Sequence, residues 1–245
     1  MPNIRFGVIG LGRFGEVHCQ TLANLPGVEL VALCTRNESR LQEFGRRFSV
    51  SQLYSDYLAM LANPLVDAVS VVTMWDQHTG PVLAALRAGK HVFVEKPLAS
   101  TAADCDAIVD AAAQSSAACM VGQICRFNPR FAAAKREIAA GSIGQIVSLY
   151  ARRNIPAAVS RTVLDKIGPI AGDAVHDTDL MLWFTGSRIV TAYAETLSVR
   201  GLANPDLAWT TYRFATGAIG VCENVWMLPE KTPHRIDERM AVIGT

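Results

Sequence analysis

Short runs of apolar, mostly β-branched residues alternate with segments of helical period through the first half of the chain. In the first of these segments Phe14, Val17, Thr21 and Leu25 recur at spacings of three and four residues, and a Pro-Gly pair ends it. Such alternation predicts a parallel sheet with helices on both faces. The predicted strands run over Ile4 to Ile9, Val28 to Cys34, Ala68 to Thr73, His91 to Glu95 and Cys119 to Gly122.

The pattern changes after Gly122, where longer segments alternate apolar and polar residues and therefore predict strands with one buried face. These strands run over Ile146 to Arg153, Ile189 to Thr196, Leu207 to Phe214, Ala218 to Trp226 and Arg235 to Ile243. We expect an α/β domain over residues 1–122, with a doubly wound parallel sheet, and an α+β domain over residues 123–245, with a predominantly antiparallel or mixed sheet. Because the chain stops two residues after the last predicted strand, we expect the second domain to be incomplete.

Composition narrows the classes of function. With 50% apolar and 18% charged residues and a net charge of +1, the chain has no excess positive charge to attract nucleic acid. It contains no apolar window of about 18 residues for a membrane span, and its start has no signal-peptide pattern. The six cysteines include no CxxC pair, which argues against a zinc ribbon and a disulfide framework. We expect a cytoplasmic protein that binds no nucleic acid, membrane or metal.

A glycine-rich loop with the sequence GLGRFG, residues 10–15, directly follows the first predicted strand and opens the first predicted helix. A dinucleotide-binding loop requires this context. Gly10 permits a tight turn, Gly12 lets the backbone approach a pyrophosphate, and Gly15 lets the helix pack against the strand. The alternative is a set of ordinary turn glycines. The position at a strand–helix junction favours cofactor binding, and Arg13 and Phe14 are then cofactor contacts as well.

The end of the second predicted strand bears on the choice between NAD and NADP. An NAD site commonly places an acidic residue about twenty residues past the glycine loop, where it binds the ribose 2′-hydroxyl. Here that point holds Thr35 and Arg36, and the first carboxylate follows only at Glu38. A hydroxyl beside a guanidinium suits a 2′-phosphate, whereas in the alternative interpretation Arg36 is a solvated surface residue. The predicted cofactor is NADP or NAD, with a small preference for NADP.

The fourth predicted strand ends in Glu95-Lys96-Pro97. Ligands bind at the carboxyl edge of a doubly wound sheet, so this motif is a candidate binding site. An edge salt bridge with a proline that ends the strand is the structural alternative.

Together these motifs resemble the glucose-fructose oxidoreductase and inositol dehydrogenase family, Gfo/Idh/MocA, over roughly Ile4 to Ile243. The resemblance rests on the glycine loop, on Val71-Val72-Thr73 followed by His78, on Ala88-Gly89-Lys90-His91-Val92 leading into Glu95-Lys96-Pro97, and on Val175-His176-Asp177. It implies that Lys96 is a catalytic residue near both nicotinamide and substrate, and that the chain associates as a homo-oligomer through the second sheet. It further implies cofactor contacts from Thr73, Met74, His78, Glu95 and Lys96. After Thr73 the family usually has Pro-Asn, whereas this chain has Met74-Trp75, a change expected to reshape the nicotinamide pocket.

A second cluster lies at Asp173, His176, Asp177 and Leu180, whose spacing places them on one face of a helix. A histidine flanked by carboxylates is a candidate general base, because a carboxylate orients the ring and raises its basicity. The alternative is a helix N-terminal turn in which the acidic residues favour the positive dipole end and the histidine is buried. The resemblance favours catalysis by His176 and Asp173. The family commonly has a carboxylate four residues before this histidine, where this chain has Gly172, so Asp173 is the weaker assignment.

Arg126, Asn128, Arg153 and Asp177 are candidates for hydrogen bonds to a polyhydroxylated substrate, although Asn128 also suits the start of a helix. The leading hypothesis is an NAD(P)-dependent oxidoreductase that acts on a secondary alcohol or ketone of a sugar, cyclitol or related polyol. In it His176 takes the hydroxyl proton and Lys96 stabilises the alkoxide. The alternative is a non-catalytic dinucleotide-binding sensor or regulatory protein of the same fold. A third hypothesis is a fragment whose second sheet has an exposed edge.

Overall fold

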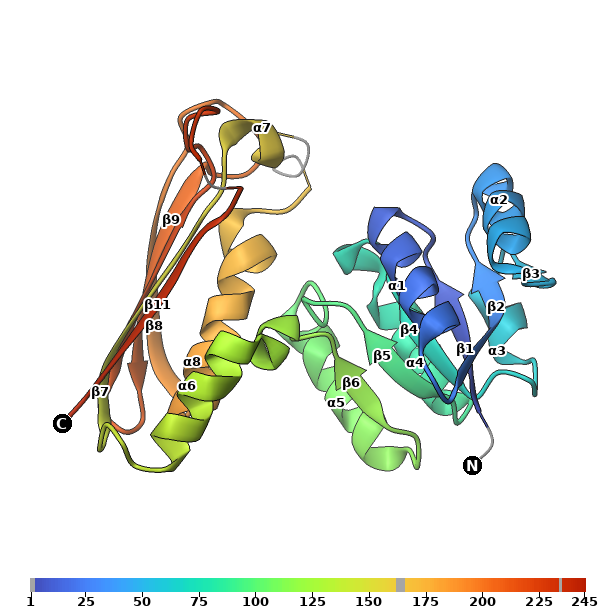
Figure 1. The fold of residues 1–245 in the computed structure, drawn as a ribbon, viewed down its shortest axis with the longest axis horizontal. Coiled ribbons are helices and arrows are strands. Elements are labelled where there is room, and N and C mark those ends of the chain that lie inside the picture. Colours follow the sequence, from blue (N-terminus) through green and yellow to red (C-terminus); the bar gives the residue numbers. More distant parts are fainter. Residues whose placement is uncertain (1–2, 162–165, 234) are drawn as a thin grey trace. The chain divides into compact units, whose positions relative to one another are not determined.

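The computed structural model describes residues 3–161, 166–233 and 235–245. The chain divides into two compact units, Met1–Gly122 and Gln123–Thr245. Each unit has its own sheet and its own buried core. In Figure 1 the first unit is coloured blue to green, and the second runs from yellow-green to red.

The first unit is built on a parallel sheet whose strands lie in the order β3-β2-β1-β4-β5-β6. The strands β2 and β3 lie on one side of β1, and β4, β5 and β6 lie on its other side, so the direction of strand addition reverses after β3. Doubly wound sheets bind their ligands at such a reversal point. The predicted doubly wound sheet is confirmed. Its strands are β1 (Ile4–Ile9), β2 (Val28–Cys34), β3 (Gln52–Tyr54), β4 (Ala68–Val71), β5 (His91–Val94) and β6 (Cys119–Val121).

Helices connect these strands, and polar side chains fix where several helices begin. The Asn37 side chain accepts a hydrogen bond from the Arg40 N–H, and the Thr101 Oγ1 accepts one from the Asp104 N–H at 3.1 Å. Each bond satisfies an amide that has no partner within its own helix. The helices are α1 (Arg13–Asn24), α2 (Glu38–Phe48), α3 (Tyr57–Leu61), α4 (Thr79–Arg87) and α5 (Ala102–Gln114).

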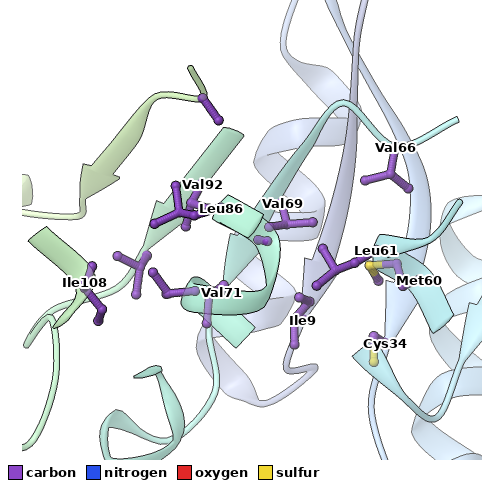
Figure 2. Close-up of a cluster of buried hydrophobic side chains, with 14 of the residues drawn as sticks. Ile9, Cys34, Met60, Leu61, Val66, Val69, Val71, Leu86, Val92 and Ile108 are labelled. Atoms are coloured by element: carbon purple, nitrogen blue, oxygen red, sulfur yellow. The ribbon is translucent and has the colours of Figure 1, made fainter. Parts of the chain in front are cut away.

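Separate apolar clusters pack on the sheet. In Figure 2, Val69 and Val71 of β4 pack in one cluster with Leu86 of α4 and Ile108 of α5. A different cluster surrounds Phe44 of α2. Burial of each such large side chain contributes about 1.5–3 kcal/mol. The two clusters hold the carboxyl ends of the strands, and hence the loops that follow them, in fixed positions.

The second unit is built on a mixed sheet with the strand order β11-β7-β10-β9-β8. β7 (Ile146–Asn154) pairs parallel with β10 (Ile219–Val225) and antiparallel with β11 (Asp237–Gly244). β9 (Leu207–Phe214) pairs antiparallel with both β10 and β8 (Ile189–Leu197). The predicted mixed sheet is therefore confirmed.

One face of this sheet packs against the helices α6 (Pro129–Ala139) and α8 (Val175–Thr185) around Leu149, Met181 and Phe214. Alternate residues of β9 are buried, as the period of two predicts. The edge strand β8 differs, because every residue after Ile189 is exposed. A short helix, α7 (Ala157–Ser160), follows β7.

The segment before α8 corrects one prediction. The spacing of Asp173 and His176 predicts a single α-helix, but Ile170–Ala174 forms a π-helical turn and α8 begins only at Val175. The N–H of Val175 donates to the carbonyl of Ile170, five residues back. The wider turn shifts Asp173 relative to the face that carries His176. Such turns occur frequently at functional sites.

Candidate cofactor site and catalytic residues

Steric constraints explain two of the three glycines in the loop of residues 10–15. Gly10 has a φ of +101°, and a Cβ there would lie 2.6 Å from the backbone of Val72. A Cβ on Gly15 would lie 2.1 Å from the carbonyl oxygen of Gly10. These two glycines therefore let β1, α1 and the β4 loop approach one another closely.

Gly12 has a different role, because no heavy atom of the described residues lies within 4 Å of a Cβ built there. It is the N-cap of α1, and no side chain among the described residues caps it. The open space therefore adjoins the amides of the first turn, which have no partner within the helix. An anion such as a pyrophosphate fits this combination of space and N–H donors. The loop thus fits a dinucleotide, and the adjacent Phe14 is 46% exposed.

At the carboxyl end of β2, the structure places guanidinium groups where an acidic residue would favour NAD. Arg36 donates to Gln77 Oε1 at 3.4 Å, and the Thr35 hydroxyl accepts from the N–H of Asn37 at 3.3 Å. Arg40, which the sequence analysis missed, donates from Nε to the carbonyl of Leu11 in the glycine loop at 2.6 Å. Its position in the first turn of α2, beside the β2 end, is the signal that could have found it.

The loop after β4 holds the predicted contacts Thr73, Met74 and His78. Met74 is 42% exposed, whereas His78 is buried at 1%. The ring of His78 contacts the carbonyl of Pro97 at 2.8 Å and the carbonyl of Thr73 at 3.3 Å. His78 therefore links the β4 loop to the Glu-Lys-Pro motif. We infer that it supports the cofactor site by holding these loops together.

The carboxylate of Glu95, directly after β5, is held by neighbours from other parts of the first unit. Its Oε1 lies 3.2 Å from His18 Nε2, and its Oε2 accepts the N–H of Lys96 at 3.3 Å. His18 belongs to α1 and also lies 2.8 Å from the hydroxyl of Ser70 in β4. The sequence analysis missed His18, although it follows Phe14 by one helical turn on the helix that the glycine loop opens.

In the second unit, a tryptophan explains the position of the candidate carboxylate. A Cβ on Gly172 would lie 2.5 Å from Cη2 and 2.8 Å from Cζ2 of Trp226. The indole, 3% exposed, therefore occupies the space that a side chain at position 172 would need. Asp173, one residue later, accepts the indole N–H at 2.8 Å. His176 lies at the start of α8 and is 9% exposed.

Arg153 and Asp177, both predicted to contact the substrate, pair with each other in the structure. Arg153 of β7 donates to both carboxylate oxygens of Asp177 on α8, at 2.9 and 3.2 Å, and both residues are buried. Glu238 of β11 lies 3.4 Å from the same guanidinium. Burial raises the pKa of Asp177, and the hydrogen bonds from Arg153 offset only part of that rise. This pair joins the helix to the sheet, because each group neutralises the other in the core.

The two other substrate candidates also have partners within the second unit. Arg126 makes a bidentate pair with Asp179 at 2.6 and 2.8 Å and lies 5.7 Å from the ring centroid of Trp183. Asn128 accepts the N–H of Arg130 at 3.0 Å and so caps α6. The capping interpretation of Asn128 thus accounts for its side chain.

The described residues contain neither a metal-binding cluster nor a membrane-spanning helix. No group of three or more histidine, cysteine, aspartate or glutamate side chains in the described ranges is arranged to hold a metal ion. Within the same ranges, no helix combines the length and the apolar character needed to cross a membrane.

Two family models match the chain. Residues 4–123 match an oxidoreductase family with an NAD-binding Rossmann fold, and residues 131–245 match the GFO/IDH/MocA C-terminal domain. The two matches cover most of both units.

Named relatives and a solved structure give consistent results. The chain is 29% identical over 248 residues to myo-inositol 2-dehydrogenase of Thermotoga maritima, covering 99% of this chain and 73% of that protein. It is 30% identical over 250 residues to scyllo-inositol 2-dehydrogenase (NAD+) of Bacillus subtilis, covering 99% and 72%. The crystal structure of an oxidoreductase domain protein from Kribbella flavida matches with a TM-score of 0.92 and 27% identity, covering 100% and 72%. The chain thus spans about three quarters of the length of these proteins.

Proposed function

The chain belongs to the Gfo/Idh/MocA family and is an NAD(P)-dependent oxidoreductase of CH–OH groups, and we propose that its substrate is an inositol or a related polyol. The observation that carries this proposal is the joint presence of the open glycine loop, of Lys96 two residues after β5, and of His176 at the start of α8. The two relatives compared above, both named as inositol dehydrogenases, support the substrate class. They give no support to the alternative of a non-catalytic sensor.

The proposal assigns the cofactor to the first unit. The N–H groups around Gly12 bind the pyrophosphate, and residues at the ends of β2, β4 and β5 bind the rest of the dinucleotide. When bound, the nicotinamide supplies the hydride acceptor for oxidation of a secondary alcohol to a ketone. Thr73, Met74 and Glu95 are the residues after β4 and β5 that would contact it.

The proposal assigns the proton to His176 and the stabilisation of charge to Lys96. A ring nitrogen of His176 accepts the hydroxyl proton of the substrate, and the Lys96 ammonium stabilises the oxygen as negative charge develops on it. Asp173 assists His176 from its position on the π-turn. The hydrogen bond from Trp226 keeps the Asp173 carboxylate in one orientation.

The choice between NADP and NAD depends on the residues after β2. Arg36 and Arg40 offer two guanidinium groups there, and Thr35 offers a hydroxyl, a set that suits a 2′-phosphate. We therefore keep the proposal that the chain prefers NADP, although one of its relatives is named for NAD+.

Two further proposals concern the oligomeric state and the cellular compartment. The exposed apolar residues of the second sheet support homo-oligomer formation through that sheet. They include Val147, Val190, Tyr193, Leu197, Trp209, Ile219 and Ile243. Each of the six cysteines, all within the described ranges, is a free thiol, which supports a reducing compartment such as the cytoplasm. Light scattering tests the first proposal, because a clean monomer contradicts it.

The function is tested by titration of the purified protein with NADPH and NADH, followed by turnover on inositol isomers and other polyols. We expect tighter binding of NADPH, reversed by Arg36→Ala together with Arg40→Ala. Lys96→Ala and His176→Ala should each lower kcat about 100-fold or more while dinucleotide binding is retained. Turnover at the wild-type rate in both variants rejects the assigned mechanism, and binding of neither dinucleotide rejects the function.

A further inference from the structure

The assigned chemistry gives no role to His18, although its ring contacts Glu95, a proposed cofactor contact. Its ring nitrogens contact two different strands: Nδ1 lies 2.8 Å from the Ser70 hydroxyl, and Nε2 lies 3.2 Å from a carboxylate oxygen of Glu95. The rings of Phe14 and Phe93 flank the imidazole, with centroids 5.3 and 5.7 Å away. His18 therefore joins α1, β4 and the end of β5 in one polar contact chain.

The direction of the hydrogen bonds follows from the partners. A carboxylate only accepts, so the N–H at Nε2 donates to Glu95. The hydroxyl of Ser70 can either donate to Nδ1 or accept from it, so its contact with the ring is compatible with a proton on Nε2. Ser70 is 1% exposed, so its hydroxyl is inaccessible to a substrate. The three side-chain types match those of a hydrolase triad, but the burial of the serine excludes nucleophilic attack.

Glu95 in turn controls the start of the next segment. Its second carboxylate oxygen accepts the N–H of Lys96 at 3.3 Å. A Cβ on Gly122 would lie 2.9 Å from Oε1 of Glu95, so the carboxylate packs directly against that backbone. Only 15% of the Glu95 side chain is exposed, and 13% of His18. The carboxylate is thus enclosed by the ring, by the Lys96 amide and by Gly122.

We propose that His18 is a positioning residue that acts through Glu95, fixing the carboxylate and with it the backbone from which Lys96 extends. The inference rests on the proposed function of Lys96. Without the Nε2 donor, the carboxylate would turn towards water and release the Lys96 amide. An error of about 1 Å in the position of a catalytic group can lower the rate about 100-fold.

Two substitutions separate this role from a purely structural one. His18→Phe retains a flat ring among Phe14 and Phe93 but removes both nitrogen atoms. His18→Gln loses the ring but keeps an N–H donor that can reach Glu95. If His18 only fills space, His18→Phe should impair kcat and dinucleotide binding less than His18→Gln does. If His18 positions Glu95, His18→Gln should impair them less than His18→Phe does.

The experiment measures kcat, the Kd for NADPH and NADH by nicotinamide fluorescence, and the melting temperature. We expect His18→Phe to lower kcat about 10- to 100-fold and to weaken dinucleotide binding severalfold, and His18→Gln to restore most of both. In a Glu95→Gln background, His18→Phe should change kcat by less than about twofold, because its effect passes through the carboxylate. Equal losses in the Phe and Gln variants, or full additivity with Glu95→Gln, overturn the proposal.

The binding measurement keeps the two proposals distinguishable. If the wild type binds a dinucleotide but oxidises no polyol, the proposed function fails. The order of the Kd values for His18→Phe and His18→Gln then decides the role of His18 alone. Should His18→Phe fail to fold, Ser70→Ala removes only the hydroxyl on the far side of the ring. A loss of dinucleotide binding in that variant supports the proposal, and unchanged Kd and kcat overturn it.

Discussion

The contact between Gly172 and Trp226 leads to a prediction about the position of the catalytic carboxylate. Gly172→Asp places an acidic residue four positions before His176, where the family commonly has one. In this chain the new Cβ would lie 2.5 and 2.8 Å from two ring atoms of Trp226, well inside the ordinary contact distance. Overpacking of this kind costs about 1–3 kcal/mol. We therefore expect Gly172→Asp to lower the free energy of unfolding by about 2 kcal/mol.

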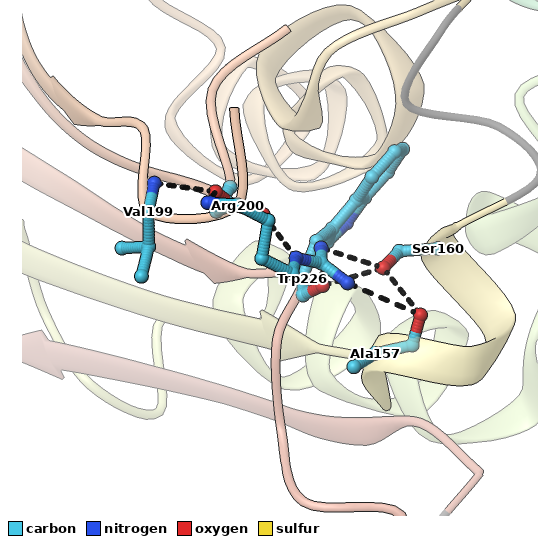
Figure 3. A network of polar contacts seen from close by, with 6 residues as sticks. Ala157, Ser160, Val199, Arg200 and Trp226 are labelled. Atoms are coloured by element: carbon cyan, nitrogen blue, oxygen red, sulfur yellow. Dashed lines mark hydrogen bonds and ion pairs between the residues drawn. The ribbon is translucent and has the colours of Figure 1, made fainter. Parts of the chain in front are cut away.

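The indole has little freedom to move away. Arg200 donates to the carbonyl of Trp226 at 2.8 Å and to the hydroxyl of Ser160 at 3.1 Å, as Figure 3 shows. The N–H of Trp226 donates to the carbonyl of Asp206 at 2.8 Å, and its indole N–H donates to Asp173 at the same distance. The backbone and the ring are thus both fixed, so the strain at position 172 falls on the helix.

Trp226→Phe removes the outer part of the indole and should relieve this clash. We expect Gly172→Asp to cost less than about 0.5 kcal/mol in the Trp226→Phe background, which gives a coupling energy of about 1.5 kcal/mol. Urea unfolding of the wild type, both single variants and the double variant, followed by circular dichroism, measures the cycle. Equal costs of Gly172→Asp in the two backgrounds would falsify the assignment of the strain to the indole.

Three further predictions concern the loop, the buried ion pair and pH. Gly12→Val should leave the fold intact and abolish dinucleotide binding, whereas Gly15→Val should unfold the first unit. The reason is that only a Cβ at position 15 meets backbone, at 2.1 Å. Fluorescence titration measures the binding, and circular dichroism measures the folding. Arg153→Met should cost about 3–5 kcal/mol by leaving Asp177 without its cation in the core, and adding Asp177→Leu should recover most of that loss in urea unfolding. Hydrogen bonds from Arg5 lower the pKa of Asp67 from 3.8 to about 2. The ionised Asp67 therefore stabilises the fold above pH 3.8, and this stabilisation is lost as the pH falls towards 2. Asp67→Asn should remove this part of the pH dependence of the melting temperature. An unchanged fall of the melting temperature at acid pH in that variant would contradict the prediction.

Hydrophobic alternation was sufficient to predict most strands of both sheets, because each strand has its own local pattern of burial. The strand β3 (Gln52–Tyr54) was missed, since three partly buried residues are too few to show a period. The π-turn at Ile170–Ala174 was also missed. Spacing arguments assume 3.6 residues per turn throughout a helix, whereas the wider turn here packs against Trp226, which directly follows β10.

The residues of the candidate site also fall into two groups, those that a local motif predicts and those that depend on distant contacts. Gly12 and Lys96 could be proposed from the sequence, because each belongs to a short motif that follows a predicted strand, a relation contained within a few residues. His18 and Trp226 were not found, because their partners lie 77 and 53 residues away in the sequence. Contacts over such separations depend on the order of strands in a sheet and on the packing of an entire unit.

A contact between residues far apart in the sequence can change the interpretation of a departure from a family motif. Taken alone, glycine at position 172 indicates a lost carboxylate and favours a protein without catalysis. With Trp226 in place, the glycine is required by the ring, and the ring supplies a hydrogen bond that holds the carboxylate of Asp173 one residue later. Gly172 and Trp226 fit each other sterically, so the glycine taken alone is not evidence against activity. A relative with aspartate at this position should therefore have a smaller residue in place of the tryptophan, because the two side chains compete for one space.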